Sequence, residues 1–171
     1  MALTIQTDNG NVEDANAYVD AAYVIAHHAD RGLDLSATPT VDLETAIVRA
    51  TDYLDQRFTF VGVPLYTDQS TGWPRSNAKD CNGWLVQGIP LAVKKATAEY
   101  ANIALSVELN PTPERDDTGQ SVAAKSESVG PISESVRYAA ASAFQMPKYP
   151  KADRLLVVKG LVVSNRQIRR G

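Results

Sequence analysis

Residues 41–58 carry the feature that most constrains the fold, a stripe of apolar side chains at helical spacing. The stripe comprises Leu43, Ala46, Ile47, Ala50, Tyr53, Leu54 and Phe58. This spacing puts these side chains on one face of an α-helix, and that face must be buried against other elements. Asp42 and Glu44 suit the positive end of the helix dipole, and Thr40 suits the capping position. The sequence therefore predicts a helix over 41–58 that packs against other helices.

Three further segments have helical patterns. Residues 12–31 repeat apolar side chains at helical spacing and stop before Gly32, a residue typical of the position after a helix. Residues 91–109 are apolar on nearly every side and rich in alanine, which predicts a largely buried helix with close neighbours. A short helix is expected over 151–158.

The remaining segments are expected to be less regular. A long loop joins the second and third helices, and two strand-compatible runs flank a Gly-Pro pair and predict a β-hairpin or extended arm. The predicted fold is mainly α, a compact bundle of three to four helices with a long inter-helix loop, the hairpin or arm and a C-terminal tail. We expect a helical core at 1–110, a polar linker with the hairpin or arm at 111–147, and a short helix with a basic tail at 148–171.

The composition is that of an ordinary soluble protein with one core. The chain has 171 residues, of which 44% are hydrophobic and 22% charged. It holds no apolar run of about 18 residues, so we expect no membrane span. The first residues carry neither a basic leader nor an apolar stretch, so no secretory signal is expected. A single Cys81 cannot form an internal disulfide, which fits a reducing cytoplasm.

The net charge of −3 hides a gradient along the chain. Residues 1–60 hold ten acidic and three basic residues, a net charge of −7. Residues 61–120 hold seven acidic and five basic residues, a net charge of −2. Residues 121–171 hold three acidic and nine basic residues, a net charge of +6. Such asymmetry is typical of a basic tail that meets an acidic partner, either a nucleic acid or the acidic half of a neighbouring subunit.

The sequence offers few groups for catalysis or metal binding. His27 and His28 are adjacent, so a helix turns them about 100° apart and they cannot bind one metal as a pair at i and i+4 would. We expect a solvated or edge pair, and we expect Asp52 and Asp55 on a solvated helix face. Cys81 has an acidic neighbour, which disfavours the thiolate that a nucleophile needs. The common phosphate-binding, hydrolase and metalloprotease motifs are absent from the sequence, so we expect no enzyme, no cofactor and no metal.

The stretch "TGWPRSNAKDCNGWLVQGIP", residues 71–90, holds both tryptophans of the chain and its cysteine. Two interpretations of this loop remain open. Its aromatic rings can fold back and cap the helical bundle. Alternatively, the loop reaches a neighbouring subunit, because tryptophan and arginine are favoured interface anchors. In that case Trp73, Arg75 and Trp84 are the candidates for the subunit interface.

Several short signatures carry a resemblance to a known family. They are Tyr53-Leu54-Asp55-Gln56-Arg57-Phe58, Phe60, Gly62, Gln69, Trp73-Pro74-Arg75, Gly88-Ile89-Pro90, and the runs "DANAYVDAAYV" and "KSESVGPISESVRYA". With these the chain resembles the head-tail connector proteins of tailed bacteriophages, also called adaptor or head-completion proteins. A related group is described as DnaT-like single-stranded-DNA-binding proteins.

The resemblance implies a structural adaptor at the head-tail junction of the virion, made in the bacterial cytoplasm. Such an adaptor forms a homo-oligomeric ring, commonly a dodecamer, under the portal protein. It extends the channel through which DNA passes without sequence-specific binding, and it docks the next tail-side protein, a stopper or tail component. Its C-terminal segment often grips the portal. By position along the chain, the portal-binding candidates here are Leu155, Leu156, Arg166, Ile168, Arg169 and Arg170.

Two other functions remain open. The first is a DnaT-like replication accessory that binds single-stranded DNA. The basic tail suits this function by its charge, although only Tyr149 lies near it to stack on bases. The second is another phage assembly component, such as a tail terminator or small head protein.

Overall fold

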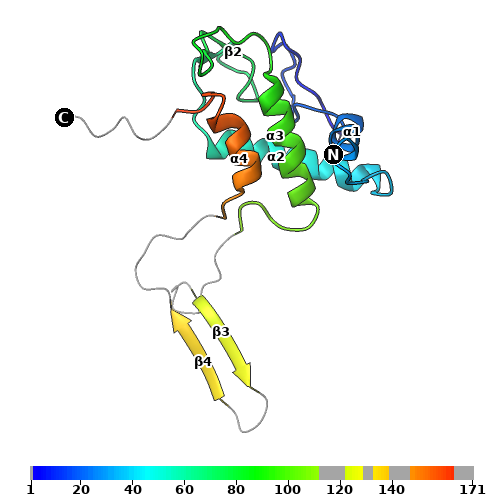
Figure 1. The fold of residues 1–171 in the computed structure, drawn as a ribbon, viewed down its shortest axis with the longest axis vertical. Helices are drawn as coiled ribbons and strands as arrows, with labels where there is room; N and C mark the ends of the chain where they lie inside the picture. The colour runs from blue at the N-terminus through cyan, green and yellow to red at the C-terminus, as the bar shows by residue number, and fades with distance from the viewer. Residues whose placement is uncertain (1, 112–121, 129–132, 139–146, 164–171) are drawn as a thin grey trace, which may run out of the picture. The chain divides into compact units, whose positions relative to one another are not determined.

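The computed structural model describes residues 2–111, 122–128, 133–138 and 147–163 (Figure 1). The chain divides into two compact units. The first comprises residues 1–109 and 148–171, and the second comprises residues 110–147. Residues 148–163, the described part of the segment that we expected to form a third part, lie in the first of these units.

The first unit contains α1 (Ala21–Ala29), α2 (Thr40–Arg57), α3 (Leu91–Ala104) and α4 (Pro150–Val157). α3 contacts each of the other three helices, and α4 lies beside it (Figure 1). The mainly helical fold with a small antiparallel hairpin is thus confirmed. None of the helices in the described residues is long and apolar enough to cross a membrane.

The core forms where α2 and α3 meet. The apolar stripe of α2 is buried as predicted, with Leu43, Ile47 and Leu54 fully enclosed. The facing side of α3 contributes several alanines together with Val93 and Tyr100, all of them buried. Small side chains let the two helix backbones approach closely, which is why an alanine-rich helix occupies the centre of the unit.

α1 begins later than its apolar pattern predicts. We expected a helix over 12–31, but α1 starts at Ala21, because the Asp20 carboxylate caps it by accepting a hydrogen bond from the Tyr23 N–H at 2.7 Å. Before the cap, Ala17 pairs with Ile5 in a short parallel bridge. The apolar residues that mimic a helix there are buried in irregular structure, where their spacing serves packing.

The long loop between α2 and α3 is tied down at several points. Its strands β1 (Val63–Pro64) and β2 (Arg75–Ser76) pair antiparallel. Gly62 has a φ of 76°, and a Cβ added there would lie 2.5 Å from the Ser76 carbonyl oxygen. Only glycine fits this close approach of two backbone segments.

The second unit contains β3 (Val122–Ser128) and β4 (Ser133–Tyr138). The two strands pair antiparallel, with Ser128 opposite Ser133, which makes a hairpin. The predicted β-hairpin is therefore confirmed.

Candidate functional site

Trp73 packs in the hydrophobic core and so connects the first half of the 71–90 loop to the helices. Its indole is fully buried, and its ring centroid lies 5.7 Å from that of Phe60. The backbone N–H of Trp73 donates a hydrogen bond to the Tyr18 hydroxyl oxygen at 3.1 Å. That hydroxyl in turn donates to an Asp55 carboxylate oxygen at 2.6 Å. The other Asp55 oxygen accepts a hydrogen bond from the Gly72 N–H at 2.8 Å. The carboxylate therefore connects α2 to both Tyr18 and the start of the 71–90 loop.

The environment of Asp55 differs from our expectation of a solvated helix face, which was wrong for this residue and correct for the exposed Asp52. Burial raises the pKa of Asp55 to about 6, against the opposing effect of the hydrogen bonds from Tyr18 and Gly72. Burial, and secondly the nearby Asp55 charge, raise the pKa of the Tyr18 phenol. The carboxylate has a structural role here, because both of its oxygens are engaged by the loop and the segment before α1.

Arg75 is also occupied within the chain. Its guanidinium donates to three backbone carbonyl oxygens, those of Val61 at 2.9 Å, Gly72 at 3.0 Å and Gly62 at 2.8 Å. Two of these bonds join Arg75 to residues 61–62, near the start of the loop between α2 and α3, and the third closes the segment 72–75. The contact with a neighbouring subunit that we predicted for Arg75 remains a prediction, and this partly buried side chain has a role in its own fold.

The second half of the loop presents Trp84 to solvent, with 75% of the residue exposed. A tight turn produces this exposure. The Asp80 N–H donates to the Trp84 carbonyl oxygen at 2.9 Å, and the Asp80 carboxylate accepts the N–H groups of Asn82 and Trp84 at 2.9 and 3.0 Å. The N–H group of Trp84 is the main reason that the pKa of Asp80 lies below its usual range. Most of the indole is therefore available to a ligand or partner.

Three lysines lie on the segments around this turn. Lys79 pairs with Leu85, next to Trp84, in a β-bridge. The Cys81 N–H donates to the Lys159 carbonyl oxygen at 2.9 Å, which holds the turn against the end of α4. Lys95, from the first turns of α3, lines a groove together with Lys159. We call Lys79, Trp84, Leu85, Lys95 and Lys159 the Trp84 face.

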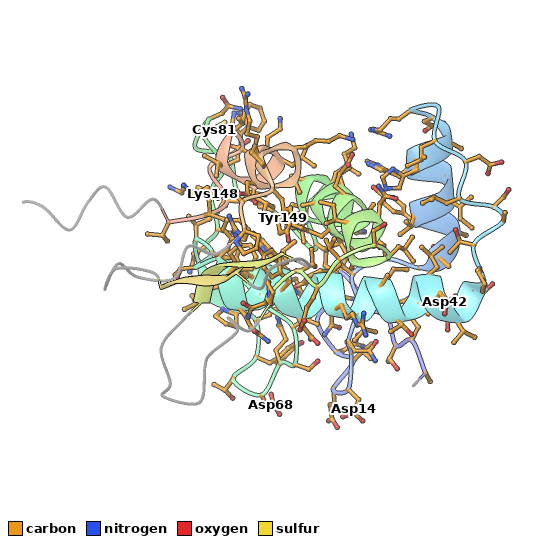
Figure 2. All side chains as sticks on the ribbon, turned by 90° about the horizontal axis from the view of Figure 1, so that it is seen from below. Asp14, Asp42, Asp68, Cys81, Lys148 and Tyr149 are labelled. Carbon is orange, nitrogen blue, oxygen red and sulfur yellow. The ribbon has the colours of Figure 1, made fainter. Side chains whose placement is uncertain are left out.

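The Trp84 turn and the acidic residues Asp14 and Asp68 lie apart. Figure 2 shows Cys81, in the Trp84 turn, on one side of α2, and Asp14 and Asp68 pointing away from the other side. A shallow pocket on that acidic side is lined by Glu13, Asp68 and the half-exposed Tyr66. Among the residues whose exposure the structure describes, Trp84 and Tyr66 are thus exposed aromatic residues with different charged neighbours. Trp84 lies on a turn with Asp80, and Lys79 and Lys159 are on the segments around that turn, whereas Tyr66 lines a pocket with Glu13 and Asp68.

Comparison with protein families gives one match. The family described as "Putative DnaT-like ssDNA binding protein" matches residues 1–171, the whole chain. The chain belongs to this family. Neither the curated proteins nor the solved structures contain a significant match to it.

One cluster of metal-ligand types occurs among the described residues. His27, His28 and Glu99 bring their ligand atoms within 4.8 Å of one another, and all three residues are buried, so our expectation of a solvated or edge histidine pair was wrong. Each group has a partner of its own. His27 Nε2 lies 3.1 Å from Glu99 Oε1, His28 Nε2 lies 3.0 Å from the Ala98 carbonyl oxygen, and the Lys151 ammonium lies 2.8 Å from Glu99 Oε2. These contacts join α1, α3 and α4, and they account for the buried polar groups without a metal.

The predicted interface residues have different positions. Trp73 and Leu156 are fully buried in the core, so their side chains are not available to a partner at the surface of the chain. Trp84 is exposed, and Leu155 lines the groove beside the Trp84 face. Arg166, Ile168, Arg169 and Arg170 lie outside the described residues.

The sequence did not predict that Lys79, Lys95 and Lys159 come to the segments around the Trp84 turn. They come from the loop, α3 and the end of α4, far apart along the chain. The only local signal was the short interval between Lys79 and Trp84, with Gly83 at the turn. The backbone hydrogen bond between Cys81 and Lys159 brings Lys159 to this turn. It joins residues far apart in the chain, and no sequence motif predicts it.

Proposed function

We propose that this chain binds single-stranded DNA through the Trp84 face. The observation that carries the proposal is an exposed indole on a turn whose surrounding segments carry Lys79, Lys95 and Lys159, whereas Asp14 and Asp68 lie on the other side of α2. The family description adds independent support, since it names single-stranded DNA as the ligand.

The chemistry of the face suits this ligand. An exposed indole can stack on an unpaired base of any kind, and each stacked base contributes about 1–3 kcal/mol. Ammonium groups neutralise phosphates and release counterions, which makes binding sensitive to salt. Neither interaction reads a base sequence, so the proposed binding is sequence-independent. The chain acts by binding, without catalysis.

Fluorescence anisotropy with a labelled oligo(dT) tests the proposal. Titrations over a series of salt concentrations should give a measurable affinity that falls as salt rises, with a logarithmic slope of about −0.7 for each phosphate contacted. Replacement of Trp84 by alanine should weaken binding by about fivefold to a hundredfold, the equivalent of one lost stacking contact.

Tyr66→Ala is the matched control. It removes another exposed aromatic side chain, but from the acidic side of the unit, where Glu13 and Asp68 would repel phosphate. Its affinity for the oligonucleotide should equal that of the unchanged chain. Equal losses in both variants, or an affinity that does not respond to salt, would contradict the proposed site.

We infer a second candidate function, the structural adaptor at the phage head-tail junction. The observation that favours it is the number of exposed aliphatic residues next to the Trp84 face, including Leu91, Val157 and Val158. Phosphates and bases do not require such side chains, whereas a protein partner would cover them. In this function the partners are further copies of the chain in a ring, the portal protein and the next tail-side protein.

Mass photometry separates the two candidates. The purified chain is measured alone, with the portal ring and with labelled single-stranded DNA. A portal mass that rises by many subunits, together with negligible DNA binding, would favour the adaptor and contradict the DNA site. Salt-sensitive DNA binding without a portal complex would favour the DNA site.

A further inference from the structure

The groove beside the Trp84 face differs in chemistry from the face itself. It has a volume of about 370 Å³ and lies between the first turn of α3, the end of α4 and the 80–86 segment of the loop. Its apolar lining consists of Val86, Pro90, Leu91, Ala92, Leu155 and Leu161. Among the residues that line it, none is aromatic, so the groove offers a nucleotide base no ring on which to stack.

The charged groups of the groove favour an anionic occupant. Lys95 and Lys159 line it, and Asp80 is its one acidic lining residue. The Asp80 carboxylate is already engaged by the N–H groups of Asn82 and Trp84. Lys159 also acts electrostatically on Asp80, so the lining carries two ammonium groups against one carboxylate and keeps a net positive charge. Leu91, which is 58% exposed, continues the apolar lining onto the surface.

We propose that this groove is a docking site for an acidic protein segment that carries aliphatic side chains. The aliphatic side chains would occupy the space lined by Leu91 and Leu155, and the carboxylates would pair with Lys95 and Lys159. Burial of a leucine-sized side chain contributes about 1.5–3 kcal/mol, and partly desolvated charge pairs add specificity and a faster association. The groove shares Lys95 and Lys159 with the Trp84 face, but Leu91 and Leu155 belong to the groove alone, so variants of Leu91 and of Trp84 can separate the two sites.

Three labelled synthetic peptides test the proposal by anisotropy with the full chain. The first alternates aspartate and leucine, the second has lysine in place of aspartate, and the third has serine in place of leucine. The first peptide should bind, with an affinity that falls as salt rises. The second and third should each bind at least about tenfold more weakly, because each lacks one of the two complementary features.

The variant Leu91→Gln locates the binding. Leu91 is the first residue of α3 and is mostly exposed, so a glutamine there leaves the core intact. It should weaken the aspartate–leucine peptide at least about fivefold, through lost apolar contact. Val41→Gln is the matched control, since Val41 is also an exposed aliphatic residue in the first turn of its helix, away from the groove. It should leave peptide affinity unchanged, as should Trp84→Ala.

Several results would overturn the proposal. One is the absence of binding by the aspartate–leucine peptide, and another is equal binding by Leu91→Gln and the unchanged chain. Self-association that only Leu91→Gln abolishes would mean that a second copy occupies the groove. If Leu91→Gln weakens oligo(dT) but not the peptide, the groove belongs to the DNA site. Failure of the DNA site itself would be seen separately, as an absence of oligo(dT) binding with peptide binding intact.

Discussion

The two tryptophans of the 71–90 loop have opposite environments. Trp73 is fully buried and connected through Tyr18 to the carboxylate of Asp55 on α2. Trp84 is 75% exposed, on a turn that closes through its own backbone and the side chain of Asp80. The same loop thus contains one tryptophan that packs in the core, Trp73, and one that is exposed to solvent, Trp84.

The difference shows how a glycine-rich loop can present a side chain without losing its shape. Burial of Trp73 and the three carbonyl contacts of Arg75 fix the first half of the loop. A backbone hydrogen bond from the Cys81 N–H to the Lys159 carbonyl oxygen connects the second half of the loop to the end of α4. These contacts order the loop that carries the exposed indole. The loop therefore loses less conformational entropy when a ligand binds.

The largest expected effect is on folding. Trp73→Ala removes a fully buried indole and should lower the free energy of unfolding by about 3–5 kcal/mol. Trp84→Ala removes an exposed ring and should change it by no more than about 0.5 kcal/mol. Urea denaturation followed by circular dichroism measures both. Comparable losses in the two variants would contradict the division between anchor and presented ring.

The second prediction concerns the pH dependence of the Trp73 anchor. Because burial raises the pKa of Asp55 to about 6 in the folded state, the folded chain binds its proton more tightly than the unfolded chain, where the pKa is about 3.9. The stability contributed by Asp55 is therefore fully present below pH ~3.9 and is lost as pH rises through ~6.

Asp55→Asn isolates this contribution. Relative to the variant, the unchanged chain should lose up to about 3 kcal/mol of unfolding free energy between pH ~4 and pH ~7, the equivalent of a pKa raised by about 2. Denaturation curves of both proteins across that range give the difference. A constant difference at every pH would show that Asp55 is not desolvated. The same series on Asp42→Asn, at an exposed carboxylate in the first turn of the same helix, serves as the control.

The smallest expected effect concerns the lysines of the Trp84 face. Lys159→Gln should weaken oligo(dT) binding modestly for every base sequence and should make the salt slope shallower by about 0.7, the value for one phosphate contact. Lys148→Gln, another exposed lysine but outside the Trp84 face as defined, should leave the slope unchanged. Equal slopes for both variants would remove Lys159 from the proposed site.

The helices of the core could be predicted because each carries its own periodic signal. The apolar stripe of α2 predicts its bounds to within a residue at each end, and the predicted short helix at 151–158 is α4 shifted by one residue. Around α1 the same signal was misleading. Apolar residues before Asp20 repeat at helical spacing, yet backbone bonds such as Asn16 N–H to the Thr4 carbonyl hold that segment in an irregular form.

The candidate site could be predicted only in part. The composition of the loop made it a candidate. The first interpretation holds for Trp73, which is buried in the core, whereas Trp84 is exposed and its contact with a neighbouring subunit remains a prediction. Which tryptophan is buried depends on partners distant in sequence, Tyr18 and Asp55 for the first and Lys159 for the turn of the second. The burial of His27 and His28 likewise depends on contacts with Glu99 and Ala98 of α3. These contacts cannot be predicted from the residues of α1 alone.

Tryptophan fluorescence during an oligo(dT) titration tests the central claim most directly, because the chain has two tryptophans and only Trp84 is exposed. Base stacking should quench the emission of Trp84 and leave that of the buried Trp73 unchanged. Trp84→Phe keeps an aromatic ring for stacking, so it should still bind by anisotropy but show no quenching. If quenching persists in Trp84→Phe, or if the unchanged chain binds DNA without any change in emission, the Trp84 face is not the DNA site.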